Sequence, residues 1–261
     1  MKQVLDAIEC RKEEFAALPL FVFMRDESLT PEQRLIFYPG MAHFIMSFAD
    51  LNKYVLREEQ AGDCYQSLVN AHTHEDDYHW TWYIEDLRAL GAERLRTGTG
   101  ALNFLWGDET RAGRILSYRL AHLIASANSA QRLALIEAME ETANVFFTQS
   151  SRLAARIEAE RGVRLKFYGQ FHFDVDSNHT LHAEAILLAG IELDAETRAR
   201  TLGMVAEVFR LFTDWMEELL RIAMKELLAQ NRRALDSGGT CNRLPQLWPE
   251  TRYPHARSSA A

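Results

Sequence analysis

The sequence predicts an all-α protein, and three observations support this class. All six prolines lie at or before residue 39 or after residue 244, and proline breaks helix interiors. The long proline-free stretch is rich in Ala, Leu, Glu and Arg, which favour helices. Segments of alternating β-branched residues joined by hairpin dipeptides, which are typical of sheets, are absent.

The chain of 261 residues is 48% hydrophobic, which is ample for a core. No Pro/Gly/Ser-rich linker interrupts the helical stretch, so we expect one domain over residues 1–235. The remainder, residues 236–261, reads as an irregular C-terminal tail.

Charge and cysteine content exclude several classes of function. The net charge is −8, from 37 acidic and 29 basic residues, and no Lys/Arg cluster marks a nucleic-acid partner. The three cysteines are scattered without a C-x-x-C pair, so neither a disulfide framework nor a cysteine zinc site is indicated. There is no signal-peptide pattern and no apolar run long enough to cross a membrane. We therefore expect a cytoplasmic protein without a membrane partner.

In the N-terminal part, a first helix is expected over about residues 2–17, followed by a loop, LPLFVFMRDES, whose apolar part enters the core. Thr30 caps the second helix, with Pro31 in its first turn. Pro39-Gly40 kinks this helix, which continues to about residue 57 on an apolar stripe. His43 lies near that stripe, where a lone histidine is usually a hydrogen-bonded core residue.

The third helix is expected over about residues 58–90, ending at Gly91. Residues 97–110 read as a loop with a short helix, and Asp108 or Thr110 caps the next helix. A long helix over about residues 129–159 ends at Arg161-Gly162, and another follows over about residues 165–190. Asp194 caps the last helix, whose buried stripe comprises Val205, Val208, Leu211, Phe212, Trp215, Leu219, Ile222 and Leu227.

One spacing, H-x3-D-x2-H, occurs twice. The first copy is His72, Asp76 and His79, and the second is His172, Asp176 and His179. Positions three, four and seven apart share one face of a helix, so each copy would present two imidazoles and a carboxylate together. This ligand set suits divalent iron, manganese or zinc. We therefore predict that the two helices face each other and hold a metal site.

Two divalent ions close together need anionic ligands to offset their mutual repulsion. The two aspartates supply two negative charges, and the helix over residues 129–159 is expected to add a third. Its candidates are Glu137, Glu140 and Glu141. A metal would also satisfy polar groups that are costly to bury alone, as in other bundle-core sites.

These motifs resemble those of the haem-oxygenase-like dimetal oxidases, over about residues 30–230. In that family the third core helix carries H-x3-D-x2-H, a glutamate lies about thirty residues upstream, and a first-helix His precedes a Leu-Gly by about a dozen residues. Here His79, followed by WTWYIEDLRALG, fits the last feature. The resemblance implies a haem-oxygenase-like bundle of about seven helices. It also implies His79, Glu140, His172, Asp176 and His179 as metal ligands, and the repeated spacing adds His72 and Asp76 to the predicted set.

The resemblance further implies ferrous iron, two ions per chain, with O2 as co-substrate. The substrate class would be a small organic molecule such as a fatty acid, an amino acid or an amine. The family usually has a glutamate upstream of the first-helix His, whereas this face offers His72, Glu75 and Asp76. Helical angle favours His72 and Asp76, with Glu75 as the substitute. A homodimer is compatible with the long amphipathic helices.

Other interpretations remain open at this level. The stretch HTHEDD is also compatible with a solvated helix face. Metal-free or non-catalytic haem-oxygenase-like proteins exist, including thiaminase-like enzymes, haem binders and small-molecule-binding proteins. Cys64 is the candidate nucleophile for the thiaminase-like alternative, and His43 is the candidate haem ligand. Aromatic residues near the motifs (Tyr78, Trp80, Trp82, Phe171 and Phe173) either line a pocket or belong to an ordinary core.

Overall fold

The computed structural model describes residues 1–60, 62–92, 97–177 and 185–236. These residues form helices and contain no strand, which confirms the all-α class. The main helices are α1 (Lys2–Ala16), α2 (Pro19–Met24), α4 (Ala42–Leu51), α5 (Cys64–Asp76), α6 (Trp80–Ala89), α7 (Gly98–Trp106), α8 (Arg111–Ala125), α9 (Ser129–Arg161), α10 (Gln170–Ser177), α12 (Ala185–Ala189) and α13 (Ala195–Asp236). Among the described residues, no helix is long and apolar enough to cross a bilayer.

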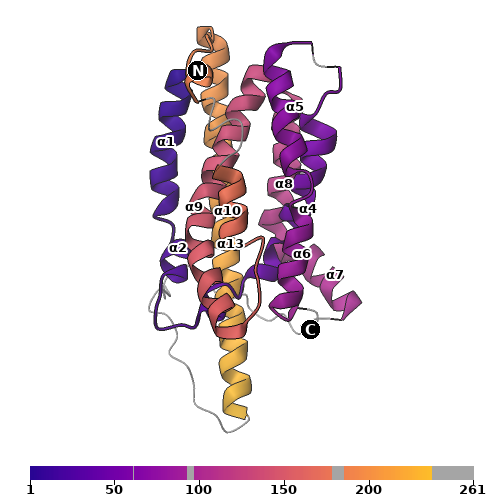
Figure 1. Cartoon of the computed structure of the whole chain (residues 1–261), viewed down its shortest axis with the longest axis vertical. Helices are drawn as coiled ribbons and strands as arrows, with labels where there is room; N and C mark the ends of the chain where they lie inside the picture. Colours follow the sequence, from indigo (N-terminus) through magenta and orange to yellow (C-terminus); the bar gives the residue numbers. More distant parts are fainter. Residues whose placement is uncertain (61, 93–96, 178–184, 237–261) are drawn as a thin grey trace, which may run out of the picture.

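Two long helices, α9 and α13, pack against each other in the middle of the bundle (Figure 1). Helix α1 lies on one side of them, and α4, α5, α6 and α8 lie on the other. Helix α9 packs against α13, α1, α10 and α5. Every residue over 130–136 is buried, and a helix that is covered on all sides is expected to be central. Side chains of α9 can therefore meet residues from both sides of the bundle.

Several predicted helix ends are confirmed. Gly91 and Gly162 follow helices with positive φ values of 82° and 66°, a conformation that glycine adopts at little cost. Thr30 caps a helix by accepting from the backbone N–H of Gln33. Asp194 accepts from the N–H of Thr197 at 2.8 Å, ahead of α13. All eight residues of the predicted stripe on the last helix are buried.

The prediction of a loop after the first helix is wrong, because PLFVFM forms α2, with Leu18 as its N-cap residue. Pro19 occupies its first turn, where the missing N–H costs nothing. The predicted burial of this stretch is confirmed, since Phe21 and Phe23 are fully buried. A helix of six residues with apolar side chains on most faces has no readable periodicity, which explains the error.

The described residues form more helices than the seven expected, because two predicted helices are broken and the predicted loop forms α2. The second becomes α3 (Pro31–Arg34), a 3₁₀ turn at Tyr38–Met41, α4, and a π-helical turn at Asn52–Leu56. The third divides into α5 and α6. The predicted helix over residues 165–190 begins at Gln170, and its described parts are α10 and α12.

Candidate metal centre

Several of the predicted ligands gather in a buried polar cluster. The first two, His72 and Asp76, lie at the C-terminal end of α5. The Nε2 atom of His72 is 3.1 Å from Oδ2 of Asp76, four residues later. Their side chains are 1% and 3% exposed, so both are removed from solvent. The predicted proximity of His72 and Asp76 is confirmed, because residues four apart share a helix face.

His79 reaches the cluster by a different route from the one predicted. It is the N-cap residue of α6, after a break in the helix, and its Nδ1 lies 3.6 Å from Oδ1 of Asp76. Arg57 contacts the chain at this break. Its guanidinium donates to the Thr73 carbonyl at 2.8 Å and pairs with Asp77 at 2.8 Å. Arg57 thus satisfies a carbonyl near the C-terminus of α5, and the chain turns over residues 77–79 before α6.

Glu140 on α9 joins the same cluster, with Oε1 3.5 Å from Nε2 of His72. One ligand atom from each of His72, Asp76 and Glu140 lies within 4.8 Å of the others, close enough for one divalent ion to bind all three. The neighbouring Glu141 points to α1 and pairs with Lys12 at 2.7 Å. Among the described residues, neither Glu137 nor Glu75 belongs to this three-residue group.

The second motif copy contributes His172, from α10. Its Nε2 lies 3.0 Å from Nδ1 of His79, and its Nδ1 lies 2.9 Å from the carbonyl oxygen of Phe167. The structure thus brings one residue of the second copy to the first copy. The Asp176 side chain and the whole of His179 lie outside the described residues. The metal-ligand role of all seven residues stays a prediction.

Aromatic rings pack against both imidazoles of the His79–His172 contact. The ring of His79 stacks on Trp82, with centroids 4.3 Å apart and planes at 20°. The ring of His172 packs between Phe147 at 4.2 Å and Phe167 at 4.8 Å. Packing of this kind restricts rotation of the imidazoles, so their nitrogens keep fixed directions.

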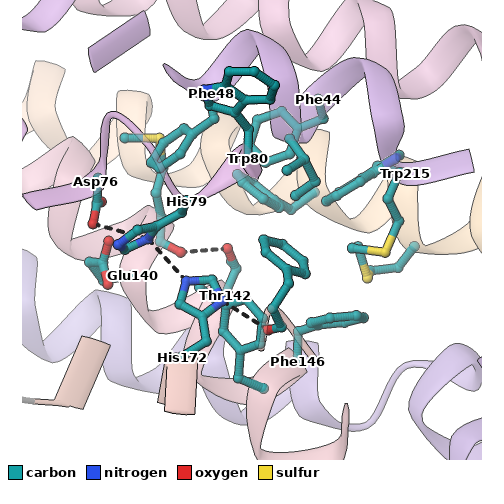
Figure 2. A pocket seen from close by; sticks show the side chains of 18 of the residues that line it. Phe44, Phe48, Asp76, His79, Trp80, Glu140, Thr142, Phe146, His172 and Trp215 are labelled. Atoms are coloured by element: carbon teal, nitrogen blue, oxygen red, sulfur yellow. Dashed lines mark hydrogen bonds and ion pairs between the residues drawn. The ribbon is translucent and has the colours of Figure 1, made fainter. Parts of the chain in front are cut away.

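A pocket of about 90 Å³ adjoins this cluster. Figure 2 shows Asp76, His79, Glu140 and His172 on one side and a set of aromatic side chains on the other. The apolar wall comes from α4, α6, α9 and α13 and includes Phe44, Phe48, Trp80, Phe146, Phe212 and Trp215. No Lys or Arg occurs among the described residues that line it. The hydroxyl of Thr142 also lines the pocket but donates to the Met139 carbonyl at 2.7 Å within α9.

Most of this wall was not predicted. Of the five aromatic residues considered near the motifs, Trp80 lines the pocket, whereas Tyr78 and Phe171 are exposed. The residues of α4 and α13 carry ordinary core periodicity, and nothing in the sequence shows that they meet a polar cluster. The pocket is therefore a product of helix packing.

The residues behind the alternative interpretations lie elsewhere. The Nδ1 atom of His43 is hydrogen-bonded to the hydroxyl groups of Ser47 at 3.3 Å and Ser117 at 3.4 Å. Burial, together with nearby Arg114, lowers the pKa of His43. Cys64 is exposed at the start of α5, eight residues before His72, which is about 12 Å along a helix. That separation is too large for a nucleophile and its general base.

Fold and site together define a helical bundle with a buried cluster of nitrogen and oxygen donors beside an apolar pocket. Comparisons of the sequence with models of known families and with curated proteins found no match. The chemistry of the donor cluster therefore carries the functional argument.

Proposed function

We propose that this protein is a non-haem iron enzyme that uses O2 to oxidise a small organic substrate. The observation that carries the proposal is the convergence of imidazoles and carboxylates at one end of an apolar pocket. Such donors are costly to bury without strong partners, and divalent metal ions are the usual partners of this mixture. A haem-oxygenase-like scaffold with two ferrous ions is part of the proposal.

The residues present fit such a site. His72, Asp76 and Glu140 would hold one ion, and His79 and His172 lie directly beside them. Asp176 and His179 are proposed as further ligands on the strength of the repeated spacing. Bound ferrous iron would supply electrons for the reduction of O2.

The protein's own groups prepare the site for this chemistry. The aromatic wall offers water few hydrogen-bond partners, and a dry pocket would strengthen electrostatic interactions within it. The two carboxylates of Asp76 and Glu140 would offset the positive charge of a bound metal ion. The Phe167 carbonyl accepts the Nδ1–H of His172, which leaves the Nε2 lone pair directed towards the cluster.

The pocket also narrows the proposed substrate. Because the described lining residues away from the cluster carry no charge, a charged distal group would be buried there without a partner. This lining favours an apolar chain whose single polar group lies at the metal. A fatty acid or an alkylamine fits this description better than an amino acid with a charged side chain.

Hexanoate and 6-aminohexanoate test this selection, because they differ by one terminal ammonium. We expect hexanoate to stimulate O2 consumption by the ferrous protein, with hexylamine as a second arm for the polar group. We expect 6-aminohexanoate to bind at least about 100-fold more weakly than hexanoate, because its ammonium loses hydration without gaining a partner. Equal binding of the two acids, measured by calorimetry, would contradict the proposed substrate class.

Glu140→Gln and Glu141→Gln form a matched pair on adjacent positions of α9. Glu140→Gln removes the negative charge of a proposed metal ligand 3.5 Å from His72 and should lower ferrous affinity about 10-fold or more. Glu141→Gln weakens the contact to Lys12 on the other face of α9 and should leave ferrous affinity unchanged. Anaerobic ferrous titration of both variants distinguishes the two residues, and equal losses would mean that the wrong face was assigned.

The metal-free alternative makes a different prediction for the same preparations. A small-molecule-binding protein would bind hexanoate in the pocket with no iron and would consume no O2. Binding without any iron-dependent O2 consumption would therefore replace the oxidase with this alternative.

A further inference from the structure

Asp86 is a fully buried carboxylate that lies outside the donor cluster. It is 0% exposed on α6 and accepts from the backbone N–H groups of Lys166 at 2.7 Å and Tyr168 at 3.0 Å. Burial raises the pKa of Asp86 to about 6, while the backbone hydrogen bonds act in the opposite direction. A buried acid of this kind needs partners, and both of these partners belong to the short loop before α10.

The residue between the two anchored amides is Phe167, whose carbonyl meets His172. That carbonyl oxygen lies 2.9 Å from Nδ1 of His172, five residues later. The Phe167 ring also packs against the His172 ring at 4.8 Å. The Tyr168 N–H belongs to the same peptide group as the Phe167 carbonyl, so Asp86 holds that peptide group directly, and it holds the 165–166 peptide group through the Lys166 N–H.

The direction of this hydrogen bond determines how His172 faces the cluster. A carbonyl oxygen can only accept, so Nδ1 carries the proton and Nε2 of the neutral ring keeps its lone pair. Nε2 is the atom 3.0 Å from His79. A shift of the loop would release both the ring orientation and the tautomer.

We propose that Asp86 is a positioning residue: by holding the loop over residues 166–168, it aims the Phe167 carbonyl at His172 and fixes that imidazole in its Nδ1–H form. The tautomer can be observed in metal-free protein and does not depend on the proposed function. The expected effect of Asp86 on ferrous affinity does rest on the proposed function.

Glu218 on α13 provides a matched control. It is 1% exposed and accepts from two backbone N–H groups, those of Ala112 at 2.6 Å and Gly113 at 3.0 Å. Burial raises its pKa as well. Glu218 anchors the start of α8 and contacts none of the cluster residues described above. A role in stability alone would make Asp86→Asn and Glu218→Gln behave alike.

The experiment compares Asp86→Asn and Glu218→Gln by histidine ring ¹⁵N NMR of metal-free protein and by anaerobic ferrous titration. The His172 signals are identified by their loss in a His172→Gln variant. Both variants should unfold at lower urea concentration than wild type, because each leaves a buried backbone N–H facing an amide group that also donates. Asp86→Asn alone should lose the uniform Nδ1–H signature of His172 and bind ferrous iron about 10- to 100-fold more weakly.

Two results would overturn the proposal. One is a wild-type His172 tautomer in Asp86→Asn, and the other is the same tautomer change in Glu218→Gln. If Asp86→Asn does not fold, the experiment uses Asp86→Glu in its place. This variant keeps the carboxylate but moves the carboxylate oxygens by the length of one methylene group. We expect a partial change of the His172 signature there, and an unchanged signature would equally refute the role. If wild-type protein binds no iron, the proposed function fails while the NMR comparison still decides the role of Asp86.

Discussion

Replacing His172 with Ala should reduce ferrous affinity by more than about 100-fold and abolish O2 consumption, because the proposed site makes His172 a direct ligand, and losing a ligand costs more than losing one of its supporting residues. His172 is 3% exposed, lies 3.0 Å from His79, and is the described residue through which the second motif copy meets the first. Anaerobic titration and an oxygen electrode measure the two effects. Circular dichroism should remain near wild type, since one side chain of α10 changes and no helix is interrupted.

The control for this variant is His122→Ala. His122 is exposed on α8, outside both motif copies, and its replacement should leave ferrous binding intact. A similar loss of iron in His122→Ala would show that binding occurs on a different surface. Unchanged iron in His172→Ala would remove His172 from the ligand set.

Gly169→Ala should be among the most destabilising single substitutions in the chain. A Cβ at this position would lie 2.0 Å from the carbonyl oxygen of Leu165, and backbone atoms cannot move aside as a flexible side chain can. We expect a loss of about 3 kcal/mol in the free energy of unfolding, at the upper end of the usual cost of overpacking. Because Gly169 lies between Phe167 and His172, ferrous affinity should fall in the molecules that remain folded.

Gly203→Ala is the matched control for that substitution. Gly203 lies on an exposed face of α13, and a Cβ added there would meet no neighbouring atom within 4 Å. Alanine is the better helix former at such a position, so stability should rise by up to about 1 kcal/mol. Urea unfolding of both variants measures the difference. Equal stability of Gly169→Ala and wild type would show that the loop before α10 has room for a side chain.

The sequence predicted part of the site well and for a physical reason. His72 and Asp76 meet because four residues make about one helical turn, and that relation holds within any helix. His79 meets them although the helix breaks before it. At the break, Arg57 contacts Thr73 and Asp77, which lie 16 and 20 residues further along the chain. Spacing along the chain carries no signal for such a contact.

The choice among the glutamates of α9 shows a similar limit. Glu140 and Glu141 differ by about 100° around the helix axis, so they face different neighbours. The resemblance to a known ligand pattern selected Glu140, and the structure places it beside His72 while Glu141 contacts Lys12. Amphipathic periodicity alone could not make that selection, because α9 is buried on several faces.

The apolar pocket could not be predicted because its walls come from helices far apart in the sequence. Phe44 on α4, Phe146 on α9 and Trp215 on α13 each occupy an ordinary core position of their own helix. Their common pocket follows from how the helices cross, which local pattern does not specify.

The most direct measurement is an anomalous difference map at the iron edge, from crystals of the protein loaded anaerobically with ferrous iron. Iron density should lie between the side chains of His72, Asp76 and Glu140, with further density adjoining His79 and His172. Crystals that bind iron elsewhere, or that show no iron among these residues at saturating concentration, would contradict the metal centre and the oxidase built on it.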